Sequence, residues 1–287
     1  MVSRDVAVII GVGGMGLAIA RRLGSGRGLL LADRDERTLK AARDALAAEG
    51  HEVAVQAVDV AEPDSMASLA ATAGGLGPVT HLAHTAGLSP VQAKPADILR
   101  VDLLGVALFL DEFAGVVAPG GAGVVIASTA GHFAPTLSPD QEAALALTPA
   151  AELARLPFLA PDLVTDQAQA YCLAKVGNLI RVRAAAKLWG RRDARVNSVS
   201  PGVVSTPMGR QELAGPWGAA MRAQVDSAPA KRVGTPDDVA DAVSFLLGQQ
   251  ARFITGTDLV VDGGAVAIHR RGGWTARAKS ATGAGRD

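Results

Sequence analysis

Residues 6–16 read VAVIIGVGGMG, an apolar run typical of a buried strand that passes directly into a glycine-rich turn and a helical pattern. Gly11, Gly13 and Gly16 would permit the tight turn and let backbone N–H groups approach a pyrophosphate at the positive end of the helix. Asp33 follows at about the spacing at which a carboxylate reaches the ribose hydroxyls of such a nucleotide. The stretch predicts a dinucleotide site. A glycine-rich turn without a ligand is the alternative.

Outward from this stretch, short β-branched runs alternate with longer Ala/Leu-rich segments, which predicts repeated βαβ units. We expect the α/β class, as a doubly wound Rossmann fold with a mostly parallel seven-stranded sheet. The expected strands are Val6–Ile10, Gly28–Ala32, Val53–Val58, Val79–His84, Gly123–Ala127, Arg195–Val199 and Asp258–Val261. The expected helices are Met15–Leu23, Asp35–Glu49, Pro63–Thr72, Ile98–Val117, Gln169–Trp189 and Pro236–Leu247. One domain is expected over residues 1–268, with an insertion at 131–168 and a disordered tail at 269–287.

The bulk composition narrows the class of partner. Of 287 residues, 49% are hydrophobic and 20% are charged, the balance of a packed globular protein. Lys+Arg and Asp+Glu each number 28, so the net charge gives no support for binding to nucleic acid or to an anionic membrane. The single cysteine, Cys172, excludes an internal disulfide and fits a reducing compartment. Residues 1–10 show no signal-peptide pattern and no membrane-spanning stretch, so we expect a cytoplasmic protein.

Metal and hydrolase chemistry find no support in the sequence. The five histidines show no ligand spacing with Cys172 or with carboxylates, and no G-x-S-x-G nucleophile elbow is present. We therefore expect no metal. His81 and His84 are expected to flank the cofactor or to hydrogen-bond a turn.

A tyrosine and a lysine four residues apart form the second candidate site. Tyr171 and Lys175, in YCLAK, lie within a helical pattern, so their side chains would share one face about one turn apart. Such a pair is common in helices. Ser128, however, ends the fifth expected strand in VVIASTAG, at the edge of a parallel sheet where ligands bind. The three residues together indicate an acid/base centre.

These motifs resemble the short-chain dehydrogenase/reductase family over about residues 6–265. IGVGGMG at 10–16 resembles the family's glycine-rich loop, shortened by one residue, and HTAG at 84–87 resembles its Asn-Asn-Ala-Gly element. NSVSPGVVSTPM at 197–208 resembles the segment that borders the nicotinamide. KRVGTPDDVADAVSFLL and ITGTDLVVDGG resemble the family's closing helix and last strand.

The resemblance implies a nicotinamide-dependent alcohol dehydrogenase or ketone reductase that acts on a small-molecule alcohol or ketone. It implies catalytic positions for Ser128, Tyr171, Lys175 and Asp102, and a homo-oligomer, a dimer or tetramer, that pairs through Ile98–Val117 and Gln169–Trp189. The nucleotide-binding residues expected from the motifs are Gly11, Gly13, Gly14, Met15, Gly16, Asp33, Arg34, Asp59, Val60, Thr85, Ala86, Gly87, Tyr171, Lys175, Pro201, Gly202, Val204 and Thr206. Because Asp33 would meet the adenosine ribose, NAD is expected rather than NADP.

The expected chemistry starts from the ordinary pKa of tyrosine, near 10, at which about one part in a thousand is phenolate at pH 7. The Lys175 ammonium and a positive nicotinamide ring would favour the phenolate, and Ser128 could donate to the carbonyl or alkoxide oxygen. Tyr171 is therefore the expected general acid/base, a role typically worth about 10²–10⁴ in rate.

Two departures from the family pattern qualify this expectation. Asp102, in VDLLG, replaces an asparagine whose main chain helps to hold a water in the proton relay, so its side chain is expected to matter little. Ser128 and Tyr171 are further apart than in most members, which indicates the insertion. A catalytically weak nucleotide-sensing or scaffold protein that retains the dinucleotide site stays open as an alternative, as does epimerase or dehydratase chemistry.

The insertion Gly131–Ala168 is expected to form a helical lid over the substrate side of the cofactor. Pro139–Leu147 and Pro149–Leu156 each begin with proline and continue with helix formers. The apolar residues that would favour bulky alcohols or ketones are Leu145, Leu153, Leu156, Phe158 and Leu159. A surface excursion or an oligomer contact is the alternative. This insertion and Met208–Val225, the segments expected to line the substrate pocket, follow no motif that identifies the substrate.

Overall fold

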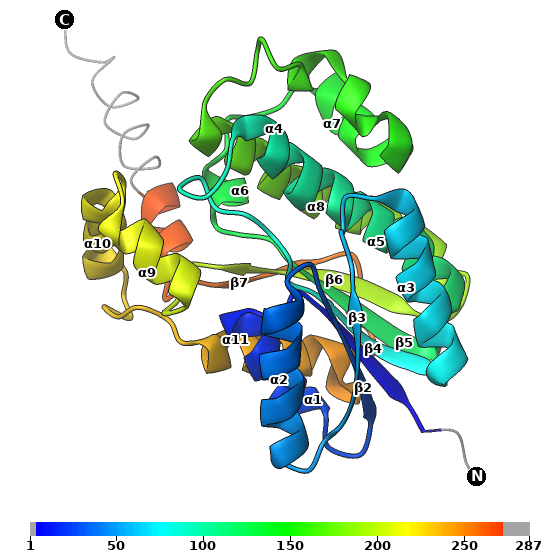
Figure 1. The fold of residues 1–287 in the computed structure, drawn as a ribbon. Coiled ribbons are helices and arrows are strands. Elements are labelled where there is room, and N and C mark those ends of the chain that lie inside the picture. The colour runs from blue at the N-terminus through cyan, green and yellow to red at the C-terminus, as the bar shows by residue number, and fades with distance from the viewer. Residues whose placement is uncertain (1–3, 272–287) are drawn as a thin grey trace, which may run out of the picture.

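The computed structural model describes residues 4–271 and contains one sheet of seven parallel strands (Figure 1). The strands are β1 (Val6–Ile10), β2 (Gly28–Asp33), β3 (Glu52–Ala57), β4 (Val79–His84), β5 (Val117–Ile126), β6 (Arg195–Pro201) and β7 (Asp258–Val261). Their order is β3-β2-β1-β4-β5-β6-β7, so the direction of winding reverses between β1 and β4. Ligands of doubly wound sheets bind outside the carboxyl ends of the strands at this reversal. The predicted fold class is confirmed.

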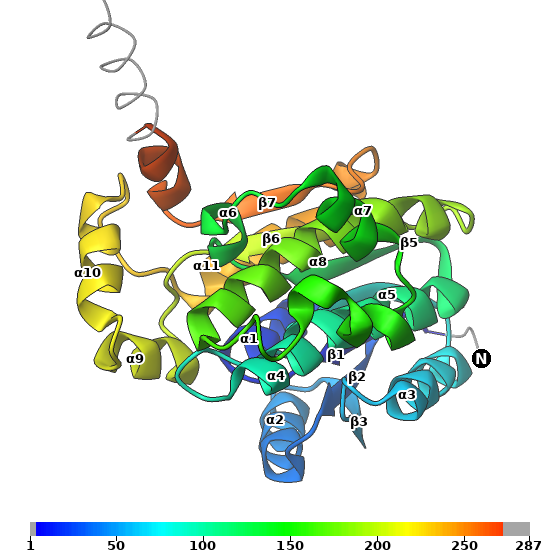
Figure 2. The same ribbon diagram turned by 90° about the horizontal axis from the view of Figure 1, so that it is seen from above.

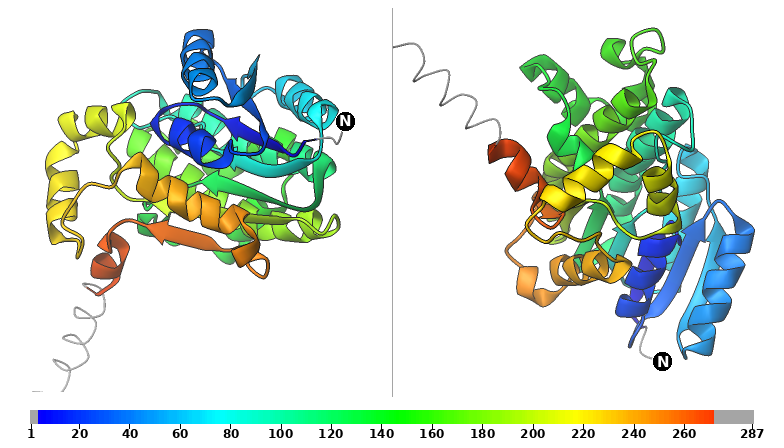
Figure 3. Two further views of the ribbon diagram at one scale, coloured as in Figure 1. Left: turned by 90° about the horizontal axis from the view of Figure 1, so that it is seen from below. Right: turned by 90° about the vertical axis from the view of Figure 1, so that its left-hand side faces the viewer.

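Helices cover both faces of the sheet (Figures 1 and 3). One face carries α1 (Gly14–Leu23), α2 (Glu36–Ala48) and α11 (Pro236–Leu247), and the other carries α3 (Pro63–Leu76), α5 (Gly105–Val116) and α8 (Gln167–Gly190). Successive residues of a strand point to opposite faces, and β1 is apolar throughout because both faces are buried. Ala7 and Ile9 pack in the core beneath α1 and α11, whereas Val6, Val8 and Ile10 pack in the core beneath α3 and α5.

The predicted helix Ile98–Val117 is interrupted. Its chain runs as α4 (Pro95–Ile98), a π-helical turn (Leu99–Leu104) and then α5. The Gly105 N–H donates to the carbonyl of Arg100, five residues back, which marks the extra residue in the turn. Such π turns are frequent at functional sites, and this one contains Asp102.

The insertion packs against the outer side of α8 (Figure 2). It contains α6 (Ala130–Phe133), α7 (Pro139–Leu147), and 3₁₀ turns at Ala150–Arg155 and Pro157–Leu159. The helix predicted at Pro139–Leu147 has these bounds in the structure, with Ser138 and Gln141 forming a capping box. The second predicted helix, Pro149–Leu156, is a 3₁₀ turn instead.

The apolar residues of the insertion pack on the helices of the core, and Leu153 and Leu159 also line a pocket of about 710 Å³ between the insertion and residues 94–104. Leu145, Leu153 and Leu159 are buried in the same cluster as α5 and α8. Leu145 lies over Gly177 of α8, where an added Cβ would come 3.7 Å from a Leu145 methyl carbon and 2.6 Å from Leu103. The role of the insertion as a lid over the substrate stays a prediction. The insertion also covers part of the helices through which we expected subunits to pair.

A buried arginine fastens the end of α7 to α8. Arg181, 6% exposed, donates to the carbonyl oxygens of Leu145 at 3.0 Å and Thr148 at 2.9 Å. These carbonyls belong to the last turn of α7 and the residue after it, which have no partner within that helix. The insertion is thus held by a polar anchor as well as by apolar contacts.

Two further differences concern the C-terminal third. α9 (Pro207–Ala214) and α10 (Gly218–Ser227) lie in the segment for which the sequence analysis predicted no element. Residues 265–271 are helical, so the start of the predicted disordered tail at 269 is wrong, and His269 packs on Phe133 with ring centroids 4.8 Å apart. The remainder of that tail lies outside the described residues.

We predict that Leu145→Ala destabilises the protein by about 2–5 kcal/mol, because it removes a fully buried side chain and leaves a cavity. The matched control is Leu147→Ala in the same helix, where the side chain is 78% exposed and little should change. Chemical denaturation of both variants measures the free energies of unfolding. Equal stabilities would mean that α7 is not packed on α8.

Candidate functional site

A cleft of about 420 Å³ opens at the carboxyl ends of β1 to β4, at the reversal of the sheet. Most of the residues expected to bind the nucleotide line it together. These are Gly11, Gly13, Gly14, Met15, Gly16, Asp33, Arg34, Asp59, Val60, Thr85, Ala86, Gly87 and Thr206. Leu88, Gln92, Val101 and Pro207 also line it and were not predicted, and Met208, expected at the substrate pocket, lines it as well.

The glycines of the loop differ in what they do. Gly11 has φ +87°, and a Cβ there would lie 2.5 Å from the Ala86 nitrogen. A Cβ on Gly16 would lie 1.9 Å from the Gly11 carbonyl oxygen. Both positions therefore require glycine for the fold. A Cβ on Gly13 would meet nothing within 4 Å, so this residue, at the N-terminus of α1, leaves open space in the cleft.

Asp33 is held rigidly at the end of β2. Its Oδ2 accepts the Val12 N–H at 2.9 Å and its Oδ1 accepts the Asp35 N–H at 3.1 Å. Asp59, the weaker candidate, accepts the Ala61 N–H at 3.0 Å and so also shapes its own turn. Both carboxylates line the cleft in fixed positions.

The far wall of the cleft is the beginning of α9. Thr206 caps this helix, its Oγ1 accepting the Gly209 N–H at 3.0 Å. Its methyl carbon would lie 3.0 Å from a Cβ on Gly14, so the two helix starts nearly touch across the cleft. Pro201, Gly202 and Val204, expected here, do not line the cleft, and Val204 is buried.

The three polar residues at the expected acid/base centre come together beside the cleft. Tyr171 and Lys175 share one face of α8, with the lysine Nζ 5.2 Å from the centre of the tyrosine ring. Ser128 follows β5, and its side chain hydrogen-bonds to Tyr171. The approach depends on Gly131 of α6, since a Cβ there would lie 3.0 Å from the Lys175 carbonyl. No sequence pattern marked this glycine.

Asp102 joins this centre through its side chain. Its Oδ2 lies 3.0 Å from the Lys175 Nζ, and its Oδ1 accepts the Leu88 N–H at 2.7 Å. Asp102 is 0% exposed and Lys175 is 4% exposed, so the ion pair is shielded from water. These side-chain contacts of Asp102 were not predicted from the sequence, and the contribution of its main chain to the proton relay stays a prediction.

Burial and charge act in opposite directions on these groups. Burial raises the pKa of Tyr171, the Lys175 ammonium opposes that rise, and the Asp102 carboxylate adds to it. Burial alone would lower the pKa of Lys175, but the carboxylate of Asp102 raises it above its ordinary value. Burial raises the pKa of Asp102, and Lys175 and the Leu88 N–H oppose the rise. Lys175 is thus held in its charged form.

Glu212 of α9 is a fourth ionisable group at the centre that the sequence analysis missed. Burial raises the pKa of this half-buried carboxyl group, and the Lys175 ammonium opposes the rise. The Glu212 carboxylate in turn raises the pKa of Tyr171. No sequence pattern marked it, because its position depends on α9 folding back across the cleft.

The histidines lie away from the cleft, which corrects their expected place. His84 is fully buried beside Phe109, with ring centroids 5.2 Å apart and neither ring nitrogen hydrogen-bonded. Burial lowers the pKa of His84 to about 3, so its ring stays neutral. His81 contacts Thr80, and burial lowers its pKa to about 4. Neither imidazole is therefore poised for acid/base work near neutral pH.

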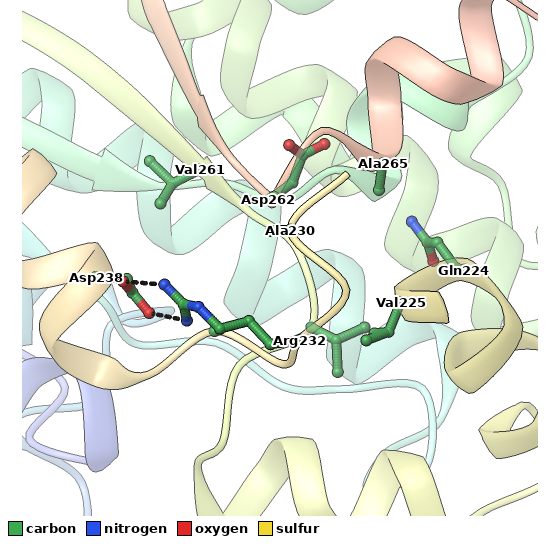
Figure 4. A pocket seen from close by; sticks show the side chains of 11 residues that line it. Gln224, Val225, Ala230, Arg232, Asp238, Val261, Asp262 and Ala265 are labelled. Atoms are coloured by element: carbon green, nitrogen blue, oxygen red, sulfur yellow. Dashed lines mark hydrogen bonds and ion pairs between the residues drawn. The ribbon is translucent and has the colours of Figure 1, made fainter. Parts of the chain in front are cut away.

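A smaller cavity of about 90 Å³ lies beside the end of β7 (Figure 4). Its arginine, Arg232, is engaged with both carboxylate oxygens of Asp238 at 2.7 and 2.8 Å. Its other carboxylate, Asp262, accepts the N–H groups of Gly264 and Val266 at 2.7 Å. The charged groups are used in structural contacts, so this cavity is not the reaction centre. Within residues 4–271, no cluster of three metal-ligating side chains occurs and no helix is long and apolar enough to span a bilayer.

Comparisons with known proteins agree with this geometry. Residues 5–138 match the family model described as short chain dehydrogenase, and residues 140–266 match the one described as Enoyl-(Acyl carrier protein) reductase. The chain is 40% identical to "Short-chain dehydrogenase/reductase bsc3" of Alternaria brassicicola, over 94% of this chain and 98% of that protein. It is 29% identical to galactitol 2-dehydrogenase (L-tagatose-forming) of Cereibacter sphaeroides, over 90% and 93% of the two chains. An actinorhodin polyketide ketoreductase with NADPH superposes with a TM-score of 0.71 at 26% identity, over 92% of this chain and 97% of that chain.

We predict that Gly16→Ala lowers the free energy of unfolding by about 1–3 kcal/mol or more, because its Cβ would overlap the Gly11 carbonyl. Gly13→Ala, the matched control in the same loop, should cost under about 1 kcal/mol, the scale of a changed helix cap. Denaturant titration of the two variants checks the contrast. A Gly16→Ala protein as stable as the parent would contradict the close contact.

Proposed function

This chain belongs to the short-chain dehydrogenase/reductase family of oxidoreductases, and on that premise we propose that it transfers a hydride between a nicotinamide dinucleotide and the carbon of a secondary alcohol or ketone. The observation that carries the proposal is the position of Tyr171, Lys175 and Ser128 together beside the cleft. A relative named for oxidising galactitol to L-tagatose and a structural neighbour named as a polyketide ketoreductase support alcohol and ketone chemistry.

The residues of the cleft fit a dinucleotide. The open side of Gly13 leaves room for a pyrophosphate at the N-terminus of α1, where N–H groups and the helix dipole favour an anion. The fixed Asp33 carboxylate would accept from the ribose hydroxyls of the adenosine, and Thr206 would close the opposite wall. When bound, the dinucleotide would supply or accept the hydride.

The residues of the chain would handle the proton. During carbonyl reduction the Tyr171 hydroxyl would give its proton to the substrate oxygen, and during alcohol oxidation the phenolate would take it back. Ser128 would donate a hydrogen bond to the same oxygen, where negative charge develops. Lys175, which has three N–H donors, would stabilise the phenolate and also reach the nicotinamide ribose.

The central test is Tyr171→Phe, which removes the proton donor and keeps the ring. Turnover with a panel of ketones should fall by about 10²–10⁴, while NADH affinity, measured by fluorescence titration, should stay within about threefold. Lys175→Ala should lower turnover and also weaken the affinity for NADH.

The matched control is Cys172→Ala at the adjacent residue of the same helix. Burial raises the pKa of the Cys172 thiol, with Asp166 acting in the same direction, so it remains a thiol and its loss should leave turnover nearly unchanged. If Tyr171→Phe keeps more than about a tenth of the parent kcat, another residue is the acid.

We also expect NADH to be preferred over NADPH, because the 2′-phosphate of NADPH would meet the Asp33 carboxylate. Two unit charges about 4 Å apart repel by about 4 kcal/mol at an effective dielectric of 20, and Arg34 and solvent should reduce the preference to about one or two decades in kcat/KM. Steady-state assays with both cofactors measure it. Asp33→Asn should lower the ratio of kcat/KM with NADH to kcat/KM with NADPH. Asp35→Asn, which changes another carboxylate of the same cleft, should leave this ratio unchanged. Equal or higher kcat/KM with NADPH would refute the assignment.

A further inference from the structure

We propose, resting on the function proposed above, that the Asp102 carboxylate is a positioning residue that offsets the field of Lys175 at Tyr171 and so keeps Tyr171 a proton donor at neutral pH. In this chain the tyrosine–lysine pair has a third, acidic member. The site would then be set for carbonyl reduction in its resting state, and oxidation would need a more alkaline medium.

The first support is the geometry of the ion pair. Lys175 reaches Asp102 at 3.0 Å in a region from which water is excluded, so the ammonium is neutralised at close range rather than by solvent. A charge that is paired in this way exerts a much weaker field on a third group than the same charge alone. The stabilisation that Lys175 gives to a phenolate is reduced accordingly.

The second support is the balance of charges around the tyrosine. Lys175 on α8 provides the positive charge, whereas Asp102 on the π-helical turn and Glu212 on α9 are both acidic. Ser128 provides a neutral hydroxyl from the end of β5. Burial raises the pKa of Tyr171, Lys175 and Ser128 oppose the rise, and both carboxylates add to it. The phenol is therefore the favoured form around pH 7.

The protonation state of Tyr171 determines the pH at which each direction of the reaction can occur. In reduction the substrate oxygen takes the proton from the Tyr171 hydroxyl, which leaves a phenolate that must recover a proton from solvent. In oxidation the hydroxyl proton of the alcohol passes to Tyr171, which must first have lost its own. The equilibrium of the overall reaction is unaffected, but the pH at which oxidation becomes fast is set by the charges on Lys175, Asp102 and Glu212.

Asp102→Asn isolates the charge from the shape. The amide keeps the size of the side chain and an oxygen that can accept from the Leu88 N–H, and it removes the negative charge beside Lys175. Asp111→Asn is the matched control. Asp111 of α5 lies 3.9 Å from Arg181 of α8, the helix that carries Lys175, but it does not act on Tyr171. Glu212→Gln removes the second carboxylate from a different element.

The readout is the ultraviolet absorbance of tyrosinate, titrated with pH in the protein without substrate. Tyr171 is the only tyrosine of the chain, so the signal reports one group, and Tyr171→Phe supplies the blank. In Asp102→Asn the phenolate fraction at a fixed pH below the midpoint should be about tenfold higher than in the parent. Glu212→Gln should give a smaller rise, and Asp111→Asn none. Circular dichroism at each pH shows where the protein is folded, and the titration curves are compared only over that range.

The same variants are then assayed in both directions against pH. The acid limb of kcat/KM for alcohol oxidation should move to lower pH in Asp102→Asn, together with the absorbance midpoint. A tyrosinate curve in Asp102→Asn that is unchanged or moved to higher pH overturns the proposal, whatever the activity. Loss of the function proposed above would show instead as absent turnover in the parent protein, with the absorbance result unaffected, so the two failures are distinguishable.

Discussion

A buried ammonium group requires a counter-charge, and the pairing of Lys175 with Asp102 determines how the catalytic end of this molecule is built. The pair connects α8 to the π-helical turn that precedes α5, and Asp102 also binds the loop after β4 through the Leu88 N–H. Three separate segments are thereby held around one charge. The π turn has one extra residue, and it lies where the Asp102 carboxylate enters the core, so the turn is part of this arrangement.

The nucleotide end depends on a different constraint, the close approach of backbones. Gly11 packs on the loop that begins at Thr85, and Gly16 packs on the Gly11 carbonyl, so no side chain can be accommodated at either position. Gly131 plays a comparable part at the catalytic end by letting α6 approach α8. Glycine contacts therefore bring the two halves of the site to the same edge of the sheet, and the charged groups act within that frame.

The insertion strengthens this frame. Arg181 and Leu145 fix α7 to α8 some distance along the helix from Tyr171, so the insertion supports the helix that carries the acid/base centre. The start of α9 bounds the cleft through its capping residue Thr206, and Glu212 of the same helix acts on the catalytic centre. α9 and α10 follow β6 directly and lie together at one end of the molecule (Figures 1 and 3). A search for the determinants of substrate choice should begin there.

The sequence by itself determined the sheet, most of the helices that cover its two faces and most of the cleft. These follow from hydrophobic periodicity and from local glycine and capping signals, which are properties of neighbouring residues. The helix at Pro139–Leu147 belongs with them, because proline, a capping serine and good helix formers suffice to specify it. The neighbour on which the apolar face of that helix packs could not be predicted from the residues of the helix alone. Whether Leu145 met a substrate or α8 depended on Gly177, some thirty residues away along the chain. The side-chain role of Asp102, the presence of Glu212 and the place of His84 were likewise decided only by tertiary structure. Each is an electrostatic or packing contact between groups that the fold brings together from separate segments. The pKa of a buried ionisable group depends on the charges that lie beside it.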